Sequence, residues 1–230
     1  MVIIDVSLLV MMGSCCSWNG ALSPDDFNAS AVALAKRWKE IDATLPQWIW
    51  MPCRRLGVLS NAEGYLVLEK VYHPSRREEQ NSDNSCFPSE ELVDDATLVQ
   101  SNNEDIMHAY DFHIVYSFSY RVPVLYFRGY TSVDGDPLNL DDIEKDLPPY
   151  SFKILSESKW TFMTQEEHPY LSRPWYMLHP CGTSDWMKLL VGGDEPREDL
   201  KTLHYLTAWL SVVGQAVGLR IPIELCHKSL

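Results

Sequence analysis

The chain has 230 residues, of which 46% are hydrophobic, and this length and composition suit a single domain with one buried core. Its formal net charge is −13 at pH 7 and it has no cluster of Lys and Arg, so nucleic acid is not an expected partner. It also lacks a phosphate-binding glycine loop and a dinucleotide fingerprint, so we expect no nucleotide cofactor.

The N-terminal residues 1–12 are apolar but are interrupted by Asp5. They are too short to span a bilayer and lack the basic leading region of a secretory signal. Translation from Met12 would instead expose a myristoylation pattern, Met-Gly-Ser-Cys-Cys-Ser. We expect residues 1–22 to form a flexible extension and residues 23–230 to form one domain with no transmembrane segment.

The first predicted helix begins after Ser23, which is a typical N-cap. Pro24 suits the first turn, and Asp26 completes a capping box. Apolar side chains then recur at helical spacing as far as about residue 42. This apolar stripe consists of Ala31, Leu34, Ala35, Trp38 and Ile41.

Four stretches predict strands. Two tryptophans between prolines, at residues 46–52, indicate the entry to a sheet, and residues 65–72 indicate the next strand. The clearest period of two runs over residues 110–120, and residues 122–128 are apolar on both faces. Because proline cannot donate a ladder hydrogen bond, Pro123 suggests an edge or a bulge.

The predicted strands are separated by connections of very different kinds. An acidic, polar run at about 75–105 predicts a long mobile loop. Residues 134–137 predict a turn, after which Asn139 is placed to cap a short acidic helix over residues 140–147. Residues 160–163 suggest a further short strand.

The chain closes with an amphipathic helix that ends near Gly218. Its apolar positions alternate at spacings of three and four. They are Leu203, Leu206, Leu210, Val213 and Val217. A helix, an antiparallel meander, an irregular segment and a final helix together predict an α+β fold.

The candidate site lies at Cys181. The six cysteines show no disulfide rhythm and no Cys-x-x-Cys pair, which favours reduced cytosolic thiols and disfavours structural zinc. Pro180 stiffens the backbone before Cys181 and disfavours helix at His179, while Gly182 leaves the thiol uncrowded. Such a thiol is a candidate nucleophile, and a small buried hydrophobe is the alternative reading.

Several segments, in order, resemble the autophagy-related protein 10 family, the ubiquitin-like-conjugating enzymes of autophagy. The resemblance covers roughly residues 27–222. The matching segments are Glu63-Gly64-Tyr65, Tyr116-Ser117-Phe118-Ser119-Tyr120-Arg121-Val122-Pro123-Val124-Leu125-Tyr126-Phe127-Arg128, Asp134-Gly135-Asp136-Pro137-Leu138, Thr164-Gln165-Glu166-Glu167-His168-Pro169, Leu178-His179-Pro180-Cys181 and Trp209-Leu210-Ser211-Val212-Val213-Gly214.

The resemblance implies a ubiquitin-conjugating-enzyme-like fold, an antiparallel sheet flanked by N-terminal and C-terminal helices. It implies that Cys181 accepts the modifier autophagy-related protein 12 as a glycyl thioester from the activating enzyme, autophagy-related protein 7. The modifier then passes to a lysine of autophagy-related protein 5. The resemblance also implies a cytoplasmic enzyme that associates transiently with autophagic membranes.

The residues that support catalysis beside Cys181 are not assigned by the usual motif. Ubiquitin carriers usually have a His-Pro-Asn motif, but here Tyr170 follows His168-Pro169. Our candidates for oxyanion donors are Thr164 and Gln165. His179, or a tyrosine such as Tyr72, is our candidate for positioning the attacking amine.

Two other classes of protein remain as alternatives. A cysteine hydrolase would pair Cys181 with His168 or His204 and release its product to water. A carrier-like fold without activity would serve only as a binding module.

Overall fold

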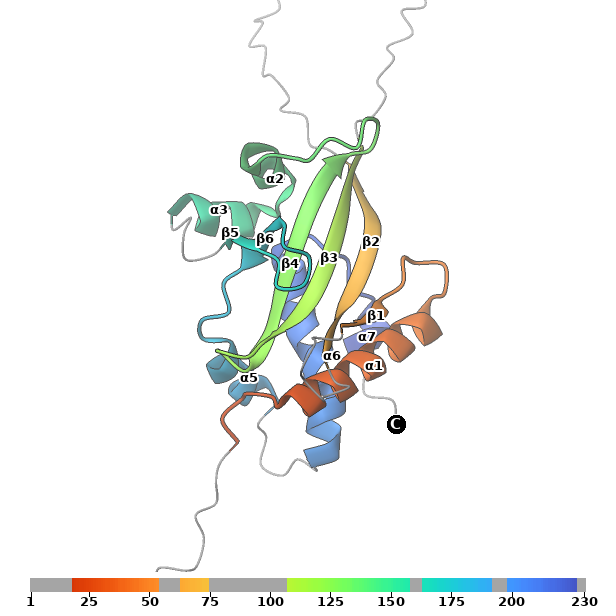
Figure 1. The fold of residues 1–230 in the computed structure, drawn as a ribbon, viewed down its shortest axis with the longest axis vertical. Coiled ribbons are helices and arrows are strands. Elements are labelled where there is room, and N and C mark those ends of the chain that lie inside the picture. Colours follow the sequence, from red (N-terminus) through yellow and green to blue (C-terminus); the bar gives the residue numbers. More distant parts are fainter. Residues whose placement is uncertain (1–17, 54–62, 75–106, 158–162, 192–197, 227–230) are drawn as a thin grey trace, which may run out of the picture.

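The computed structural model describes residues 18–53, 63–74, 107–157, 163–191 and 198–226 (Figure 1). The possible myristoylation pattern and the acidic run at about 75–105 lie outside the described residues. The described chain forms one six-stranded antiparallel sheet with helices against it. The predicted α+β fold, an antiparallel sheet flanked by N-terminal and C-terminal helices, is confirmed.

The first four strands form an antiparallel meander. The sheet order is β1-β2-β3-β4-β6-β5, so the last two strands form a hairpin whose second strand joins β4. This hairpin leaves β5 at one edge of the sheet and β1 at the other. The strands are β1 (Ile49–Pro52), β2 (Gly64–Pro74), β3 (Met107–Ser117), β4 (Val122–Thr131), β5 (Met163–Glu167) and β6 (Pro174–Leu178).

The helices lie before, between and after the strands. The long helices α1 and α6 contact each other, and α6 lies behind the strands in the view of Figure 1. Among the helices of the described ranges, none combines the length and the apolar character needed to span a bilayer. The helices are α1 (Pro24–Ile41), α2 (Leu140–Asp146), α3 (Pro149–Glu157), α5 (Thr183–Val191), α6 (Glu198–Ala216) and α7 (Ile223–Cys226).

Local sequence signals explain where α1 and α2 begin. The Ser23 side chain accepts the Asp26 N–H, and the Asp26 carboxylate accepts the Ser23 N–H, which completes the predicted capping box. The Asn139 side chain accepts the Asp142 N–H at the start of α2. Both predicted N-caps are therefore confirmed.

The main core fills the space between the sheet and the helices. The stripe of α1 contributes Ala31, Leu34 and Trp38, which are all buried. From the closing helix, Tyr205 and Trp209 are buried in the same cluster. Burial of such apolar surface is the dominant favourable contribution to folding.

The opposite face of the sheet is also covered, and we call it the outer face. A second buried cluster there includes Tyr65, Val115, Tyr126 and Trp175, with Tyr170 packed on it. The β5–β6 hairpin supplies Trp175 and Tyr170, so it folds over this face. Both faces of β3 and β4 are therefore buried, unlike the usual half-exposed antiparallel strand.

Two details of the sheet differ from the sequence expectations. Strand β4 lies between β3 and β6, so Pro123 is not on an edge strand; β6 pairs only with Tyr126 and Phe127, beyond the proline. Strand β3 ends at Ser117, and both Phe118 and Tyr120 lie in the exposed β3–β4 turn. The turn begins there because Arg121 N–H donates to Ser117 O.

Two helices and one strand boundary also differ from the expectations. The helix α2 ends ahead of Pro148, and Pro149 then starts α3, consistent with the tolerance of proline in a first helical turn. The short α7 carries no sequence signal that we identified. Strand β5 begins at Met163, where the predicted strand ends, and residues 160–162 lie outside the described residues.

Residues 18–22 belong to the folded domain rather than to a flexible extension. Leu22 is buried, Tyr116 Oη donates to Leu22 O, and Tyr205 Oη donates to Gly20 O. Gly20 has φ +81°, and a Cβ placed on it would lie 1.8 Å from Ser184 O at the start of α5. Only glycine fits this approach.

Candidate active site

The Cys181 corner joins β6 to α5. The chain leaves the sheet after Leu178, passes the buried Pro180, and enters α5 at Thr183, whose N–H donates to Pro180 O over 3.1 Å. Gly182 takes φ +73°, and a Cβ there would meet no atom within 4 Å. The corner is stiff and open, as the sequence predicts.

Cys181 itself is exposed. The structure describes one other cysteine side chain, Cys53, which is half-buried on the outer face. The alternative reading of Cys181 as a small buried hydrophobe is therefore wrong. Its position just ahead of the nine-residue helix α5 also places it near the positive end of the helix dipole, which favours nearby anions.

His179 is fixed to the backbone of this corner. The Cys181 N–H donates to His179 Nδ1 over 3.2 Å, so the neutral ring carries its proton on Nε2. The ring of Tyr120 contacts it edge to face, with 6.0 Å between centroids. His179 thus presents an Nε2–H donor beside the thiol-bearing residue.

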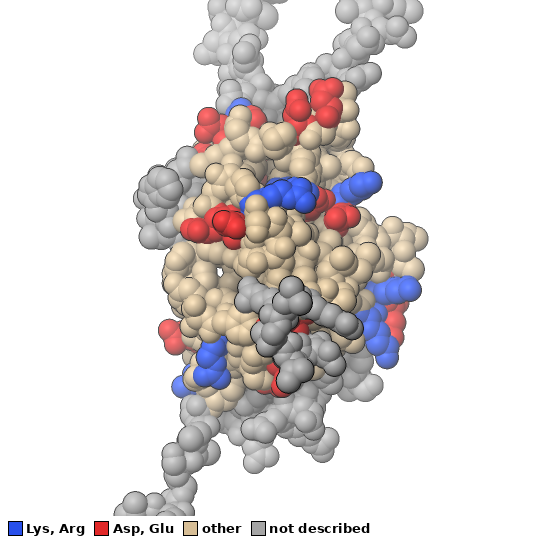
Figure 2. Space-filling model, viewed as in Figure 1, with Lys and Arg blue, Asp and Glu red and all other residues tan. Residues whose placement is uncertain are grey.

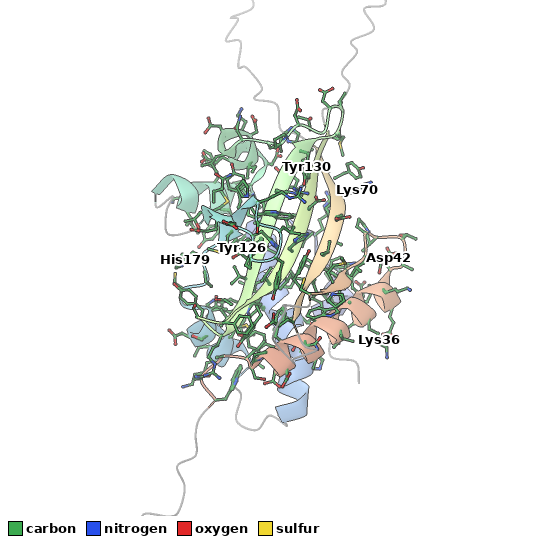
Figure 3. All side chains as sticks on the ribbon, viewed as in Figure 1. Lys36, Asp42, Lys70, Tyr126, Tyr130 and His179 are labelled. Atoms are coloured by element: carbon green, nitrogen blue, oxygen red, sulfur yellow. The ribbon has the colours of Figure 1, made fainter. Side chains whose placement is uncertain are left out.

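A cleft of about 580 Å³ opens on the outer face next to this corner. Its floor is formed by Val115, Val124, Tyr126 and Met177. One wall is the β3–β4 turn at 117–120, and the other is the β5–β6 hairpin; His179 and Pro180 form the end wall. We call this space the aromatic cleft. Tyr126 on the floor and His179 at the end are labelled in Figure 3.

The two predicted oxyanion donors lie next to each other on β5 but on different faces. Thr164 pairs with Met177 and lines the aromatic cleft, and its buried Oγ1 has no hydrogen-bond partner among the described atoms. Gln165 pairs with Tyr176 and, because successive strand residues alternate, points to the opposite face. The structure brings Thr164, and not Gln165, to the cleft.

Tyr72 lies far from the Cys181 corner. It pairs with Ala109 near the start of β3, whereas the aromatic cleft lies at the Ser117 end of the same strand. Eight residues of strand separate the two positions, or about 26 Å at about 3.3 Å per residue. This placement removes Tyr72 from the site. A tyrosine that the sequence reasoning missed, Tyr120, contacts His179 instead.

His168 is fully buried and forms a pair with His113. The Tyr170 N–H donates to His168 Nδ1, so His168 Nε2–H donates to His113 Nδ1, 3.0 Å away. Burial lowers the pKa of His168 to about 4, with a further contribution from the nearby Arg128. Burial, His168 and Arg128 lower the pKa of His113 to about 3. Both rings are neutral at pH 7.

The positions of His168 and His204 test the alternative of a cysteine hydrolase, in which one of them would act as the base for Cys181. His168 is enclosed in the outer face by Tyr65, Tyr126 and Trp175, so it cannot serve the exposed thiol as a base. His204 is half-buried on α6. Within the described residues, no group of three or more His, Cys, Asp and Glu side chains is arranged to hold a metal ion.

The charges around the site are scattered. On the face shown in Figure 2, Lys and Arg side chains lie in small groups beside Asp and Glu, with uncharged surface between them. None of the described residues that line the aromatic cleft is a lysine or an arginine, whereas Glu166 and Glu167 line its β5 side.

Comparison with known proteins identifies the family. Residues 26–224 match the family model "Autophagocytosis associated protein, active-site domain". The chain is 50% identical over 219 residues to the ubiquitin-like-conjugating enzyme ATG10 of Arabidopsis thaliana, covering 91% of this chain and 96% of that protein. The chain belongs to the ATG10 family. It is therefore a ubiquitin-like-conjugating enzyme, a transferase of the E2 type in autophagy, as the sequence predicts.

More distant members of the ATG10 family support the same assignment. The Dictyostelium discoideum enzyme is 32% identical over 237 residues, covering 90% of this chain and 99% of that protein. The human enzyme is 38% identical over 145 residues, covering 61% of this chain and 64% of that protein. A crystal structure titled as the autophagic E2 Atg10 aligns with a TM-score of 0.43 and 16% identity, covering 87% of this chain and 99% of that one.

Proposed function

We propose that this ATG10-family enzyme carries autophagy-related protein 12 on Cys181 and transfers it to a lysine of autophagy-related protein 5. The activating enzyme, autophagy-related protein 7, supplies the modifier. The observation that carries the proposal is the exposed thiol of Cys181 at an open corner between β6 and α5, in a chain whose family model is an active-site domain.

The first transfer charges Cys181. Its thiolate attacks the carbonyl carbon of the thioester that joins the modifier to the activating enzyme. A new C–S bond forms to Cys181 Sγ, and the C–S bond to the activating enzyme breaks, so that its thiolate leaves. The exposure of Cys181 and the absence of any side chain at Gly182 leave space for this exchange.

The second transfer moves the modifier to the acceptor. A neutral lysine amine attacks the carbonyl carbon, a C–N bond forms, and the C–S bond to Cys181 breaks; the amine loses one proton. The product is an isopeptide, and Cys181 leaves as a thiolate. Because charge develops on the carbonyl oxygen, hydrogen-bond donors near it accelerate this step.

Two residues near Cys181 suit these supporting roles. His179 accepts the Cys181 N–H at Nδ1 and presents Nε2–H, so it is positioned to donate to the oxyanion; it has no free acceptor with which to orient the attacking amine, the role expected from the sequence. Thr164 also lines the cleft, and its buried Oγ1 has no hydrogen-bond partner among the described atoms. We assign no role to Gln165 or Tyr72, since neither lies on the cleft.

The test is to charge the enzyme with activating enzyme, modifier and ATP, followed by intact mass under non-reducing conditions. Wild type should gain one modifier in an adduct that thiol reductants remove. Cys181→Ser should give an oxygen ester that persists in reductant, and Cys53→Ala should behave as wild type. A reductant-sensitive adduct that still forms on the Cys181→Ser variant would refute the assignment of Cys181 as the nucleophile. Release of free modifier from a finished conjugate would instead indicate a hydrolase.

A further inference from the structure

The aromatic cleft has a feature that the two transfers do not explain. Two large apolar side chains of the β3–β4 turn, Phe118 and Tyr120, are 52% and 50% exposed on its wall. Phe118 contacts the buried Tyr116 edge to face, and Tyr120 contacts His179. Exposed aromatic side chains that are held in place by such contacts are typical of binding surfaces.

The aromatic cleft is continuous with the Cys181 corner. His179 and Pro180, which close its end, are the two residues directly before Cys181. The cleft then extends along the β5–β6 hairpin as far as Glu167, which pairs with Pro174. Leu178 and Pro174 are four residues apart on β6, or about 13 Å at about 3.3 Å per residue. The space suits about four residues of extended chain.

The chemistry of the aromatic cleft favours an apolar peptide. The floor is apolar, with Val115, Val124 and Met177 around the Tyr126 ring. Polar groups at the rim come from the exposed Ser119 on one side and the exposed Glu166 and Glu167 on the other. This combination of an apolar floor with a few hydrogen-bonding groups is typical of ligand clefts.

We propose that the aromatic cleft binds the C-terminal tail of the ubiquitin-like modifier as an extended peptide. The terminal glycine lies at Cys181, and an apolar residue just before it packs against Phe118 and Tyr120. This inference rests on the proposed function, because only a modifier carried on Cys181 must bring its tail to this corner. Phe118 and Tyr120 are then specificity-determining residues.

The acceptor lysine fits the aromatic cleft less well. Its ammonium group would be attracted to carboxylates, and the two acidic residues of the cleft, Glu166 and Glu167, lie toward the end away from Cys181. A lysine that attacks at Cys181 cannot also reach that end. The part of the cleft nearest the thiol is aromatic and apolar, which suits the side chain of the modifier.

The experiment combines a variant of the enzyme with a variant of the tail. Thioester formation on the full chain is measured with the native modifier and with one whose five residues before the terminal glycine are changed to Gly and Ser. Phe118→Ala is compared with wild type, and Phe152→Ala, 47% exposed on α3, is the matched control. A thermal melt checks that each variant is folded.

Coupling between the two changes is the expected result. With the native tail, Phe118→Ala should lower the kcat/KM for charging about five- to tenfold, because it removes an aromatic contact from the wall of the cleft beside the thiol. With the Gly/Ser tail it should change little, since the contact is already lost. Phe152→Ala should match wild type with both tails.

Three results would overturn the assignment. Equal losses with both tails would mean that Phe118 does not contact the tail, and no loss with either tail would mean that the aromatic cleft is not used in charging. Normal charging with slow discharge to the acceptor would assign the cleft to the acceptor. In each case wild type still forms its adduct; if wild type forms none on Cys181, the proposed function itself fails.

Discussion

Two His-Pro pairs, one in the turn of the β5–β6 hairpin and one directly after β6, have the same local geometry and opposite surroundings. In each, the histidine Nδ1 accepts the backbone N–H of the residue two positions on, over 3.2 Å: Tyr170 to His168 and Cys181 to His179. His168 is fully buried on the outer face, whereas His179 is half-buried at the rim of the aromatic cleft. The same turn therefore serves as a packing element in one place and presents a thiol in the other.

The largest difference should appear on removal of the buried ring. His168→Ala deletes a ring packed against Tyr65 and Trp175 and leaves His113 Nδ1 unpaired. We expect a loss of about 3 kcal/mol in the free energy of unfolding, which corresponds to a fall in Tm of about 6–12 °C. Calorimetry of both variants measures the contrast in the free energy of unfolding, since His179→Ala should lose less than about 1 kcal/mol. Equal losses would contradict it.

The second difference is pH dependence. The pKa of His168 is lowered to about 4 in the folded state, below its usual value near 6.5, so the unfolded state binds the proton more readily. The stabilisation is fully present above about pH 6.5 and is lost as pH falls toward 4, by about 3 kcal/mol.

Urea unfolding of wild type, His168→Ala and His179→Ala at pH 7 and pH 4.5 provides the measurement. His179→Ala should keep the wild-type pH dependence, and His168→Ala should lose about half of it. The other half remains because the pKa of the buried His113 is also lowered, mainly by burial, and contributes with the same sign. An unchanged slope in His168→Ala would refute the assignment of the pH dependence to this pair.

The third difference concerns activity. His179→Ala removes the acceptor of the Cys181 N–H and the Nε2–H beside the thiol, so we expect transfer from charged enzyme to the acceptor to slow about tenfold. Single-turnover discharge of pre-charged enzyme measures this step. A rate equal to wild type would remove His179 from the mechanism.

The smallest effect should come from the residue that follows the thiol. Gly182→Ala adds a methyl group to open space, but at φ +73° it costs about 1 kcal/mol of backbone strain. The corresponding position after the buried pair, Leu171, already carries a side chain packed on the outer cluster. A chemical denaturation curve detects the change; a loss well above about 2 kcal/mol would mean that the corner is more constrained than described.

Local chemistry made much of the fold predictable. The capping box of α1, the Asn139 cap and the corner at Pro180 were all correctly placed from short-range sequence, because their partners lie within a few residues. The place of Pro123 was not, because the pairing of β4 with β6 is a contact between distant segments. No local pattern reports which strand lies on an edge.

The site was predictable only in part, for the same reason. Cys181 and His179 could be singled out because proline and glycine flank the thiol in sequence. Thr164 reached the cleft and Gln165 did not, although they are neighbours, because the strand direction and register decide which face each side chain meets. Tyr120 was missed as a contact of His179, since 59 positions of chain separate the two residues.

The glycine ahead of α1 has a consequence for the thiol. The Gly20 backbone lies directly against Ser184, three residues beyond Cys181, while Leu22 N–H donates to Arg121 O in the turn that bears Tyr120. One short segment thereby sets the spacing between the reactive residue and the opposing wall. Adding a single methyl group at position 20 would widen that gap, and conjugation would slow without any change in the residues that perform it.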